Sequence, residues 1–346
     1  MARMSDIAAH LGLSRLTVSA VLNNRTEQVG ISQETAARVR AAAAELGYHR
    51  NHLAVAMKTG RNRVIGCILS RLQAEWMTRT LSGVLQWSHQ SQYLIKIEEV
   101  YGLESEKAVL ARLIQQRVAG IFCCNLNSEI AFVKILRKTS EQYAVPVVCS
   151  FSRKDLAARW VDSDDRQGIF SAVRHLWDLG HRRLAFIAGM SLEKVRSNAF
   201  LDAMAELGSP VPEDFMIWTD WRLDKAAEAA HALLKKGRRR PTAILCANDK
   251  IAAIVIREAR SLGFEVPRDL SVIGFSNSQV CDLLDPPLTS VAQAFEEIGR
   301  RCGEVLEEMI EQQWEKKLDG HRKRELIPTW LEVRQSTAEA PRRSKE

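Results

Sequence analysis

The sequence predicts two kinds of domain, a short all-α head at the N-terminus and an α/β body of two lobes with parallel sheets. Three observations support this prediction. The chain of 346 residues is too long for one ordinary hydrophobic core. Its first part contains short amphipathic segments punctuated by glycine and asparagine. From residue 64 onward, short apolar runs alternate with amphipathic segments, which is the pattern of strands joined by crossover helices.

We divide the chain on this pattern into a helical head (1–50), a linker (51–63), a two-lobed body (64–337) and a charged C-terminal tail (338–346). The composition, 46% hydrophobic and 26% charged, is that of a globular chain. No apolar run approaches the roughly 18 uncharged residues of a membrane helix, and the first residues lack the apolar core of a signal peptide. The seven cysteines are scattered, with no CxxC pair. We therefore expect a cytoplasmic protein without membrane anchor, structural metal or cofactor.

Positive charge is concentrated in the head. Residues 1–63 contain nine lysines and arginines against four acidic residues, a net charge of +5, whereas the whole chain carries +7. A basic module on a nearly neutral body is typical of a protein that binds a polyanion, most simply nucleic acid. A basic surface that faces only water fits the charge equally well, so charge alone leaves both interpretations open.

The head begins with an amphipathic segment that Gly12 ends. Ser14 is placed to cap a second helix, because its hydroxyl can accept a hydrogen bond from first-turn N–H groups. In that helix Val18 and Val21 face inward, and Asn23 stands at its end. Two short helices joined by a tight glycine turn are typical of the helix-turn-helix, whose second helix lies in the DNA major groove. The residues left at or near the surface of this second helix are Arg15, Leu16, Thr17, Ser19 and Ala20.

A further helix is expected after Ser32, over QETAARVRAAAAELGY. Ser32 can cap its first turn, and Gly47 is well placed to end it. Its alanines, Val39 and Leu46 would pack beneath the first two helices. A helical bundle with no nucleic-acid partner has the same periodicity, so this alternative also stays open.

The body shows eight apolar runs that we interpret as buried strands, each separated from the next by roughly a helix and its turns. Eight such units exceed one comfortable sheet, and we therefore expect two lobes. In sheets of this kind, ligands bind at the carboxyl ends of the strands. The runs are VIGCIL, LIKIEEV, AGIFCCN, VPVVCSF, LAFIAG, FMIW, TAILCAN and LSVIGF.

Several longer segments occur in a specific order: MSDIAAHLGLSRLTVSAVLN, ISQETAARVRAAAAELGYHRNHLAVAMKTGRNRVIGCIL, DLGHRRLAFIAG, PTAILCAND, GFEVPRDLSVIGF, DPPLTSVAQ and LEVRQST. Together they resemble the lactose-repressor (LacI/GalR) family of bacterial regulators over nearly the whole chain. The resemblance implies a helix-turn-helix head, a hinge helix and two Rossmann-like lobes of the type I periplasmic-binding-protein kind, which close on a small molecule.

The resemblance assigns the major groove to Arg15, Leu16 and Ala20. Arg15 would bond guanine O6 and N7 bidentately, Leu16 would pack on a thymine methyl group, and Ala20 would offer only a methyl contact where a larger polar residue is common. The loop NNRTEQVGISQET is a few residues longer than the usual family connection. The residues expected to bond phosphates or to support the helix are Ser14, Thr17, Ser19 and Asn23.

The segment NHLAVAMKTG resembles the hinge helix of the family, within residues 51–63. In the family this helix folds when two chains pair on DNA and wedges an apolar residue into the minor groove. Met57 occupies the wedge position and Lys58 follows it. An apolar wedge unstacks a base step and kinks the duplex. The alternative is a plain linker with one exposed methionine.

The resemblance also assigns four residues to the small-molecule effector. Arg196 would fork onto hydroxyl or carboxylate groups, and Asn248 would offer a donor and an acceptor to a pair of sugar hydroxyls. Trp221 would stack on a ring, and Trp76 lies where the first strand–helix loop carries an aromatic residue. The ordinary alternatives are a surface ion pair for Arg196 and core positions for the two tryptophans.

Two departures from the family pattern concern the same site. Ser276 stands, with Asn277, where paired aspartates are usual after GF, and the loop SRLQAEWM introduces Arg71. A site that loses an acid and gains a cation would favour an acidic or phosphorylated sugar. Alternatively, Asp249 supplies the acid or acts as a helix cap, and Arg71 faces water.

The function predicted is a ligand-controlled DNA-binding regulator, a repressor by default because most relatives repress. Its partners would be a pseudo-palindromic duplex DNA, a small carbohydrate and a second copy of the chain, since the tail shows no leucine heptads for a tetramer. KKGRRRP (235–241) is interpreted as a solvated loop rather than a second DNA contact.

The chain contains no GxGxxG, GxxxxGK[ST], HExxH or GxSxG motif, and no catalytic residue is assigned. The rivals are a solute-binding protein, which leaves the basic head unexplained, and a sugar- or nucleoside-metabolising enzyme.

Overall fold

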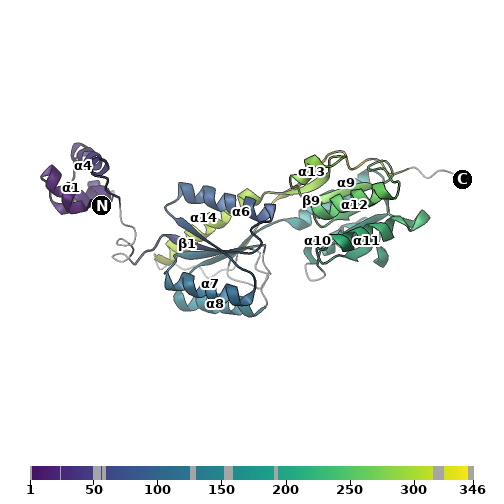
Figure 1. The fold of residues 1–346 in the computed structure, drawn as a ribbon, viewed down its shortest axis with the longest axis horizontal. Coiled ribbons are helices and arrows are strands. Elements are labelled where there is room, and N and C mark those ends of the chain that lie inside the picture. The colour runs from purple at the N-terminus through teal and green to yellow at the C-terminus, as the bar shows by residue number, and fades with distance from the viewer. Residues whose placement is uncertain are drawn as a thin grey trace. The chain divides into compact units, whose positions relative to one another are not determined.

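The structure is a computed structural model that describes residues 2–23, 25–49, 56, 60–124, 130–151, 159–190, 194–314 and 323–341. The chain separates into two compact units, Met1–Asn62 and Arg63–Glu346. The first unit is the helical head, and the second is a body with two lobes (Figure 1). Met57 and Lys58, the expected wedge and its neighbour, lie outside the described residues. None of the helices in the described ranges is both long and apolar enough to cross a membrane.

The head is all-α, as expected, and its helices enclose a small core around Ile7, Val18, Val21 and Val39. Gly12 ends the first helix in the left-handed conformation, with φ of 65°, which glycine adopts without strain. The sequence analysis predicted no helix in the loop after the second one, yet a short helix occupies it. The helices in the described part of the head are α1 (Met4–Leu11), α2 (Arg15–Leu22), α3 (Thr26–Val29) and α4 (Gln33–Glu45).

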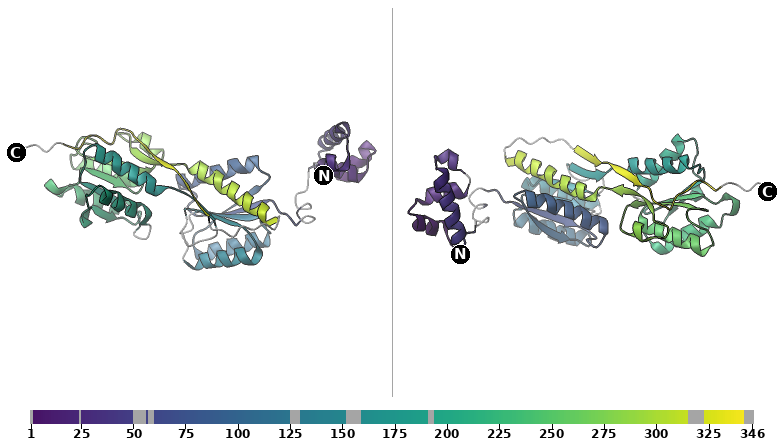
Figure 2. Two further views of the ribbon diagram at one scale, coloured as in Figure 1. Left: turned by 180° about the vertical axis from the view of Figure 1, so that it is seen from behind. Right: turned by 90° about the horizontal axis from the view of Figure 1, so that it is seen from above.

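The first lobe contains a six-stranded parallel sheet in the order β11-β5-β4-β3-β1-β2. Helices α6 and α14 cover one face of this sheet, and α7 and α8 cover the other (Figures 1 and 2). Both faces are therefore apolar, as the unbroken hydrophobic runs predict. The strands are β1 (Val64–Leu69), β2 (Leu94–Glu99), β3 (Gly120–Cys124), β4 (Val147–Ser150), β5 (Arg159–Ser163) and β11 (Lys323–Ile327). The helices are α6 (Glu75–Gln90), α7 (Leu103–Gln115), α8 (Ile130–Tyr143) and α14 (Phe295–Trp314).

The second lobe has a six-stranded sheet in the order β12-β10-β9-β8-β6-β7, parallel except for the antiparallel edge strand β12. On the helical layers, α9 contacts α10 and α11 contacts α12. The strands are β6 (Leu184–Ala188), β7 (Met216–Trp218), β8 (Ala243–Cys246), β9 (Ser271–Ser276), β10 (Thr289–Gln293) and β12 (Thr329–Glu332). The helices are α9 (Asp165–Asp178), α10 (Lys194–Glu206), α11 (Leu223–Leu234), α12 (Asp249–Ser261), α13 (Val280–Leu283) and the 3-10 turns Glu213–Phe215 and Gly237–Arg239.

Neither lobe is a continuous stretch of chain. The described chain passes between the lobes three times: from β5 to α9, from β10 to α14, and from β11 to β12. As a result α14, which follows the second lobe in sequence, packs in the first lobe against α6. The two-lobed prediction is confirmed, with this interleaving as an addition.

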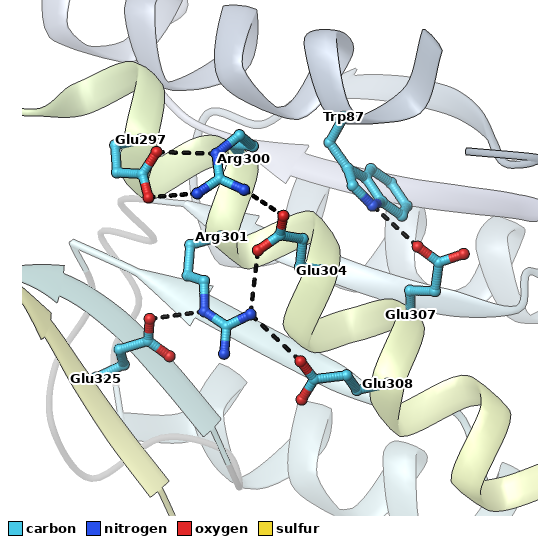
Figure 3. A network of polar contacts seen from close by, with 8 residues as sticks. All are labelled: Trp87, Glu297, Arg300, Arg301, Glu304, Glu307, Glu308 and Glu325. Atoms are coloured by element: carbon cyan, nitrogen blue, oxygen red, sulfur yellow. Dashed lines mark hydrogen bonds and ion pairs between the residues drawn. The ribbon is translucent and has the colours of Figure 1, made fainter. Parts of the chain in front are cut away.

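Helices α6 and α14 pack closely because Gly83 of α6 faces α14 and Gly299 of α14 faces α6. An added Cβ at Gly83 would lie 1.9 Å from the Glu296 carbonyl oxygen, and one at Gly299 would lie 1.9 Å from the Thr80 carbonyl oxygen. Polar contacts along α14 extend this packing (Figure 3). Trp87 of α6 donates to Glu307 at 3.0 Å, and Arg301 of α14 donates to Glu325 of β11 at 2.7 Å.

His181 is fully buried in the second lobe. Its Nδ1 lies 2.9 Å from the Thr242 hydroxyl, and its Nε2 lies 3.0 Å from the Ala338 carbonyl. The Ala340 N–H donates to the Leu179 carbonyl at 2.8 Å. The first residues after 337 are thus hydrogen-bonded to this lobe.

We predict that His181 makes the stability of the body depend on pH. Burial lowers the pKa of its imidazole below the ordinary value of about 6.5. The unfolded state then binds a proton at higher pH than the folded state, so stability falls as the pH falls below that ordinary value. The measurement is the free energy of unfolding at about pH 7 and about pH 5.5. His181→Gln should lose less stability over this interval than the wild type, and an identical loss would contradict the assignment.

Candidate DNA-reading helix and ligand-binding wall

The first turn of α2 is built as the capping prediction requires. The Ser14 hydroxyl accepts a hydrogen bond from the Thr17 N–H at 3.0 Å and lies 2.8 Å from the Thr17 hydroxyl. This cap leaves Arg15 exposed and Leu16 82% exposed at the start of the helix. A large apolar side chain open to this extent on a basic head has no packing role within the head. Both side chains are therefore free to contact another molecule.

Ser19 and Asn23 are partly engaged within the helix itself. The Asn23 side-chain amide donates to the Ser19 carbonyl at 2.6 Å and to its hydroxyl at 3.2 Å. These hydrogen bonds support the end of the helix, and the phosphate contact stays a prediction.

The expected surface position of Ala20 is wrong. Its side chain is only 5% exposed. The chain folds back at this point, because the Arg25 N–H donates to the Ala20 carbonyl at 2.9 Å and α3 then packs against α2. The longer loop was noticed in the sequence, but its effect on Ala20 depends on the path of α3, which periodicity does not predict.

At the carboxyl edge of the second sheet, Arg196 of α10 lies in a defined setting. Its Nε donates to Asp165 of α9 at 2.8 Å, and its Nη1 donates to the Ala247 carbonyl after β8 at 2.6 Å. The guanidinium carbon lies 3.9 Å from the centre of the Phe275 ring in β9. Four elements thus hold the planar guanidinium in one orientation, a better-defined position than a surface ion pair would give.

Further polar side chains continue this arrangement. The Gln293 amide donates to the Ser163 hydroxyl at 2.6 Å and to Asp165 at 3.0 Å, and the Ser163 hydroxyl donates to Asp165. The Ser276 hydroxyl donates to the Gln293 side-chain oxygen at 3.2 Å. We call this set the polar wall; it consists of Ser163, Asp165, Arg196, Ser276 and Gln293.

The sequence analysis missed two of the main residues of this wall. Asp164 caps the start of α9, because its carboxylate accepts from the Gln167 N–H at 3.0 Å. Asp165 instead pairs with Arg196. Gln293 lies in the quoted segment DPPLTSVAQ without an assigned role. Its position at the end of an apolar strand was the available signal.

Asn248 and Asp249 differ from their expected roles. The Asn248 side-chain oxygen accepts from the Ile251 N–H at 2.8 Å and caps α12, so its NH₂ group is left for a ligand. Asp249 is 2% exposed and accepts from the N–H and hydroxyl of Ser278 and from the Ser290 hydroxyl. Burial raises the pKa of the Asp249 carboxyl, although these hydrogen bonds act in the opposite direction. Asp249 therefore fixes the loop after β9 and does not supply a surface acid beside the wall.

Trp221 lies against the end of β6. An added Cβ at Gly189 would fall 2.3 Å from the indole ring of Trp221, so the ring covers the glycine directly. The turn that carries it has φ values of 51° at Asp220 and 62° at Trp221, a conformation that costs free energy in residues other than glycine. Its partly buried ring packs against the core of this lobe.

Trp76 and Arg71 lie in the first lobe. Trp76 is half-buried, with its ring centre 5.2 Å from that of Phe151 in an edge-to-face arrangement, and Phe151 lies 5.8 Å from Phe295. Arg71 is exposed just after β1, with φ of 57°. The two residues follow the carboxyl end of β1, and Phe151 follows that of β4.

Within the described residues, no group of three or more histidine, cysteine and acidic side chains is placed to bind a metal ion. A basic helix-turn-helix unit joined to a two-lobed α/β body with polar groups at its strand ends defines a class of protein, the DNA-binding regulator with an effector-binding domain. The family comparisons agree. Residues 3–51 match the model for bacterial regulatory proteins of the lacI family, and residues 173–337 match a periplasmic binding protein-like domain.

The chain belongs to the LacI family of bacterial regulatory proteins. It is 32% identical over 299 residues to the HTH-type transcriptional regulator DegA of Bacillus subtilis, covering 85% of this chain and 87% of DegA. The solved Lac repressor dimer bound to operator and the anti-inducer ONPF has the same fold, with a TM-score of 0.78 and 23% identity, covering 97% and 99% of the two chains. The transcriptional regulator CelR–cellobiose complex has a TM-score of 0.70 and 25% identity, covering 97% and 100%. These relatives are regulators rather than enzymes.

We predict that Gly189→Ala displaces Trp221 and destabilises the second lobe by about 1–3 kcal/mol, the usual cost of overpacking. The measurement is the free energy of unfolding in urea. Adding Trp221→Ala to Gly189→Ala removes the clashing ring, so the double variant should be more stable than the sum of the two single losses predicts. Strict additivity would show that the ring does not cover this glycine.

Proposed function

We propose that this chain is a sequence-specific DNA-binding repressor that works as a homodimer. Its affinity for a pseudo-palindromic operator would be controlled by a sugar or sugar derivative bound between the two lobes. The observation that carries the proposal is the polar wall around Arg196 at the carboxyl edge of the second sheet, in a chain whose basic head presents the capped helix α2. Such strand ends are the usual ligand sites of open α/β sheets.

DNA reading would rest on the first turn of α2. Arg15 can donate bidentately to guanine, and Leu16 can contact a thymine methyl group. Because Ala20 is buried, it is not available to contact a base, and the base step that it would face is not contacted by this residue. Met57 and Lys58 remain the proposed hinge residues for the minor groove.

A sugar fits the chemistry of the two lobes. The wall and the NH₂ group of Asn248 offer hydrogen-bonding groups to hydroxyls, and Trp221 and Trp76 offer aromatic surface. Ligand sites of this kind combine apolar lining with a few placed polar groups. The cellobiose bound by CelR is a sugar in a protein of the same fold.

A second copy of the chain would pack beside β2. This strand forms an edge of the first sheet, and Leu94 on it is 63% exposed, with Ile97 and the following Tyr101 also exposed. An open edge strand with apolar side chains is a site for pairing with another chain. In the second lobe, the exposed Leu283 of α13 is a further apolar contact for a partner.

We predict that Arg15→Ala weakens operator binding by about 1–3 kcal/mol and relaxes the preference at one base in each half-site, because a bidentate guanine contact is lost. The measurement is selection of bound sites from a random duplex pool, followed by titration of the selected operator. Arg38→Ala is the matched control, since it removes the same charge from an exposed position on α4. Equal weakening on all sequences would make Arg15 a phosphate contact.

We predict that Arg196→Ala abolishes the response of operator binding to sugars while operator affinity without sugar is retained. Arg166→Ala removes an exposed arginine of the same lobe and serves as the control. The measurement is operator binding with and without a panel of sugars. Loss of operator binding in Arg196→Ala would indicate a structural role for this residue instead.

A further inference from the structure

We infer that the effector is electrically neutral where it meets the polar wall, and that Asp165 is the residue that sets this preference. The ligand class is a polyhydroxylated molecule without a carboxylate or phosphate on that side. The inference rests on the proposed function, because it specifies the kind of sugar that the site accepts.

The charge of Arg196 is already matched by Asp165. The two side chains are 21% and 16% exposed, and Nε lies 2.8 Å from the carboxylate oxygen. An anionic ligand would have to share the guanidinium with this carboxylate and would be repelled by it at short range. Gln293 and Ser163 donate to Asp165 as well, which holds the carboxylate in place against Arg196.

Arg196 nevertheless retains donors for a neutral ligand. Of the five N–H groups of an arginine side chain, the Nε–H is used by Asp165 and one Nη1–H by Ala247. Stacking on Phe275 holds the guanidinium plane fixed, so the remaining N–H groups have a set direction. A fixed donor array with no net charge is matched by hydroxyl oxygens.

Three further side chains at this edge are neutral. Ser276 and Asn277 occupy the positions where the family pattern led us to look for paired acids, and Asn248 contributes an amide. The side-chain oxygen of Asn277 is buried and has no hydrogen-bond partner among the described residues. A buried acceptor of this kind needs a donor, which a hydroxyl provides and an ionised acid does not.

These contacts reject the acidic or phosphorylated sugar considered from the sequence. That sugar was suggested by Ser276, which replaces an acid of the family pattern, and by Arg71, which adds a cation. In the structure Asp165 provides the missing negative charge. Near Arg71, Glu99 accepts from the Leu72 N–H at 2.9 Å and Glu75 accepts from the Gln279 N–H at 3.1 Å, so carboxylates accompany the cation at this edge.

The test uses the full-length protein and matched probes. Glucose, galactose, ribose and cellobiose are each compared with an acid or phosphate derivative, such as gluconate, galacturonate and ribose 5-phosphate. Binding is read as a shift in unfolding temperature and as a change in operator affinity. The variant is Asp165→Asn, and Asp164→Asn is its control because it makes the same change one residue away, at the helix cap.

We expect the wild type and Asp164→Asn to bind the neutral sugars and not their anionic derivatives. In Asp165→Asn the ratio of the anionic to the neutral dissociation constant should fall at least about ten-fold, since the charge of Arg196 is then unmatched. Asp165→Glu keeps the charge and should keep the neutral preference, which covers the case in which Asp165→Asn folds poorly.

Each remaining outcome overturns a defined statement. Binding of an anionic probe by the wild type as tightly as its neutral parent overturns the present inference, while a sugar effector still stands. Identical ratios in Asp165→Asn and Asp164→Asn overturn the role of Asp165. If no probe of either kind affects a wild type that binds its operator, the sugar effector proposed above is overturned.

Discussion

The three passages of the chain between the lobes run side by side and are hydrogen-bonded to one another, and the body depends on this joint. The Asp164 N–H, after the first passage, donates to the Ile327 carbonyl of the third at 2.8 Å. The Thr329 hydroxyl donates back to the Asp164 carbonyl at 2.8 Å. Gln293, at the second passage, donates to Ser163 at the first. Each lobe is completed by segments that arrive through this joint, so neither lobe is a complete sheet without it.

The polar wall stands on the same joint. Ser163, Asp165 and Gln293 are the residues at which the chain leaves one sheet for the other, and Arg196 is fixed by Asp165. A ligand that bound the wall, as proposed above, would therefore contact the segments that join the two lobes. Linkage then requires ligand and operator to alter each other's affinity by the same factor.

Much of this architecture was accessible from the sequence because it follows from local rules. The unbroken apolar runs predicted the buried strands, and Ser14 and Ser32 predicted the starts of α2 and α4 through their caps. Arg196 and Trp221 were assigned to the ligand through the family resemblance, and this role stays a prediction. The prediction failed where a side chain meets a partner distant in sequence. Asp165 and Gln293 are 128 residues apart, and no periodicity connects them.

The burial of Ala20 is a failure of a different kind. Helical periodicity places this residue near the reading face, and that placement is correct for an isolated helix. Exposure, however, depends on what else packs nearby, and here α3 and the turn at Arg25 fold back toward it. A short insertion after a helix can thus change which of its residues are accessible without changing the helix itself.

The position of Asp165 has a consequence for how this protein can diverge. The same carboxylate balances the charge of the ligand arginine and belongs to the joint between the lobes, so a substitution there changes what is recognised and how recognition is transmitted. Trp221 and Ser276 do not combine these two roles, since neither residue lies on a passage between the lobes. Substitutions at those two positions can therefore change the preferred ligand alone. A substitution at position 165 would change the preferred ligand and the proposed effect of the ligand on operator affinity together.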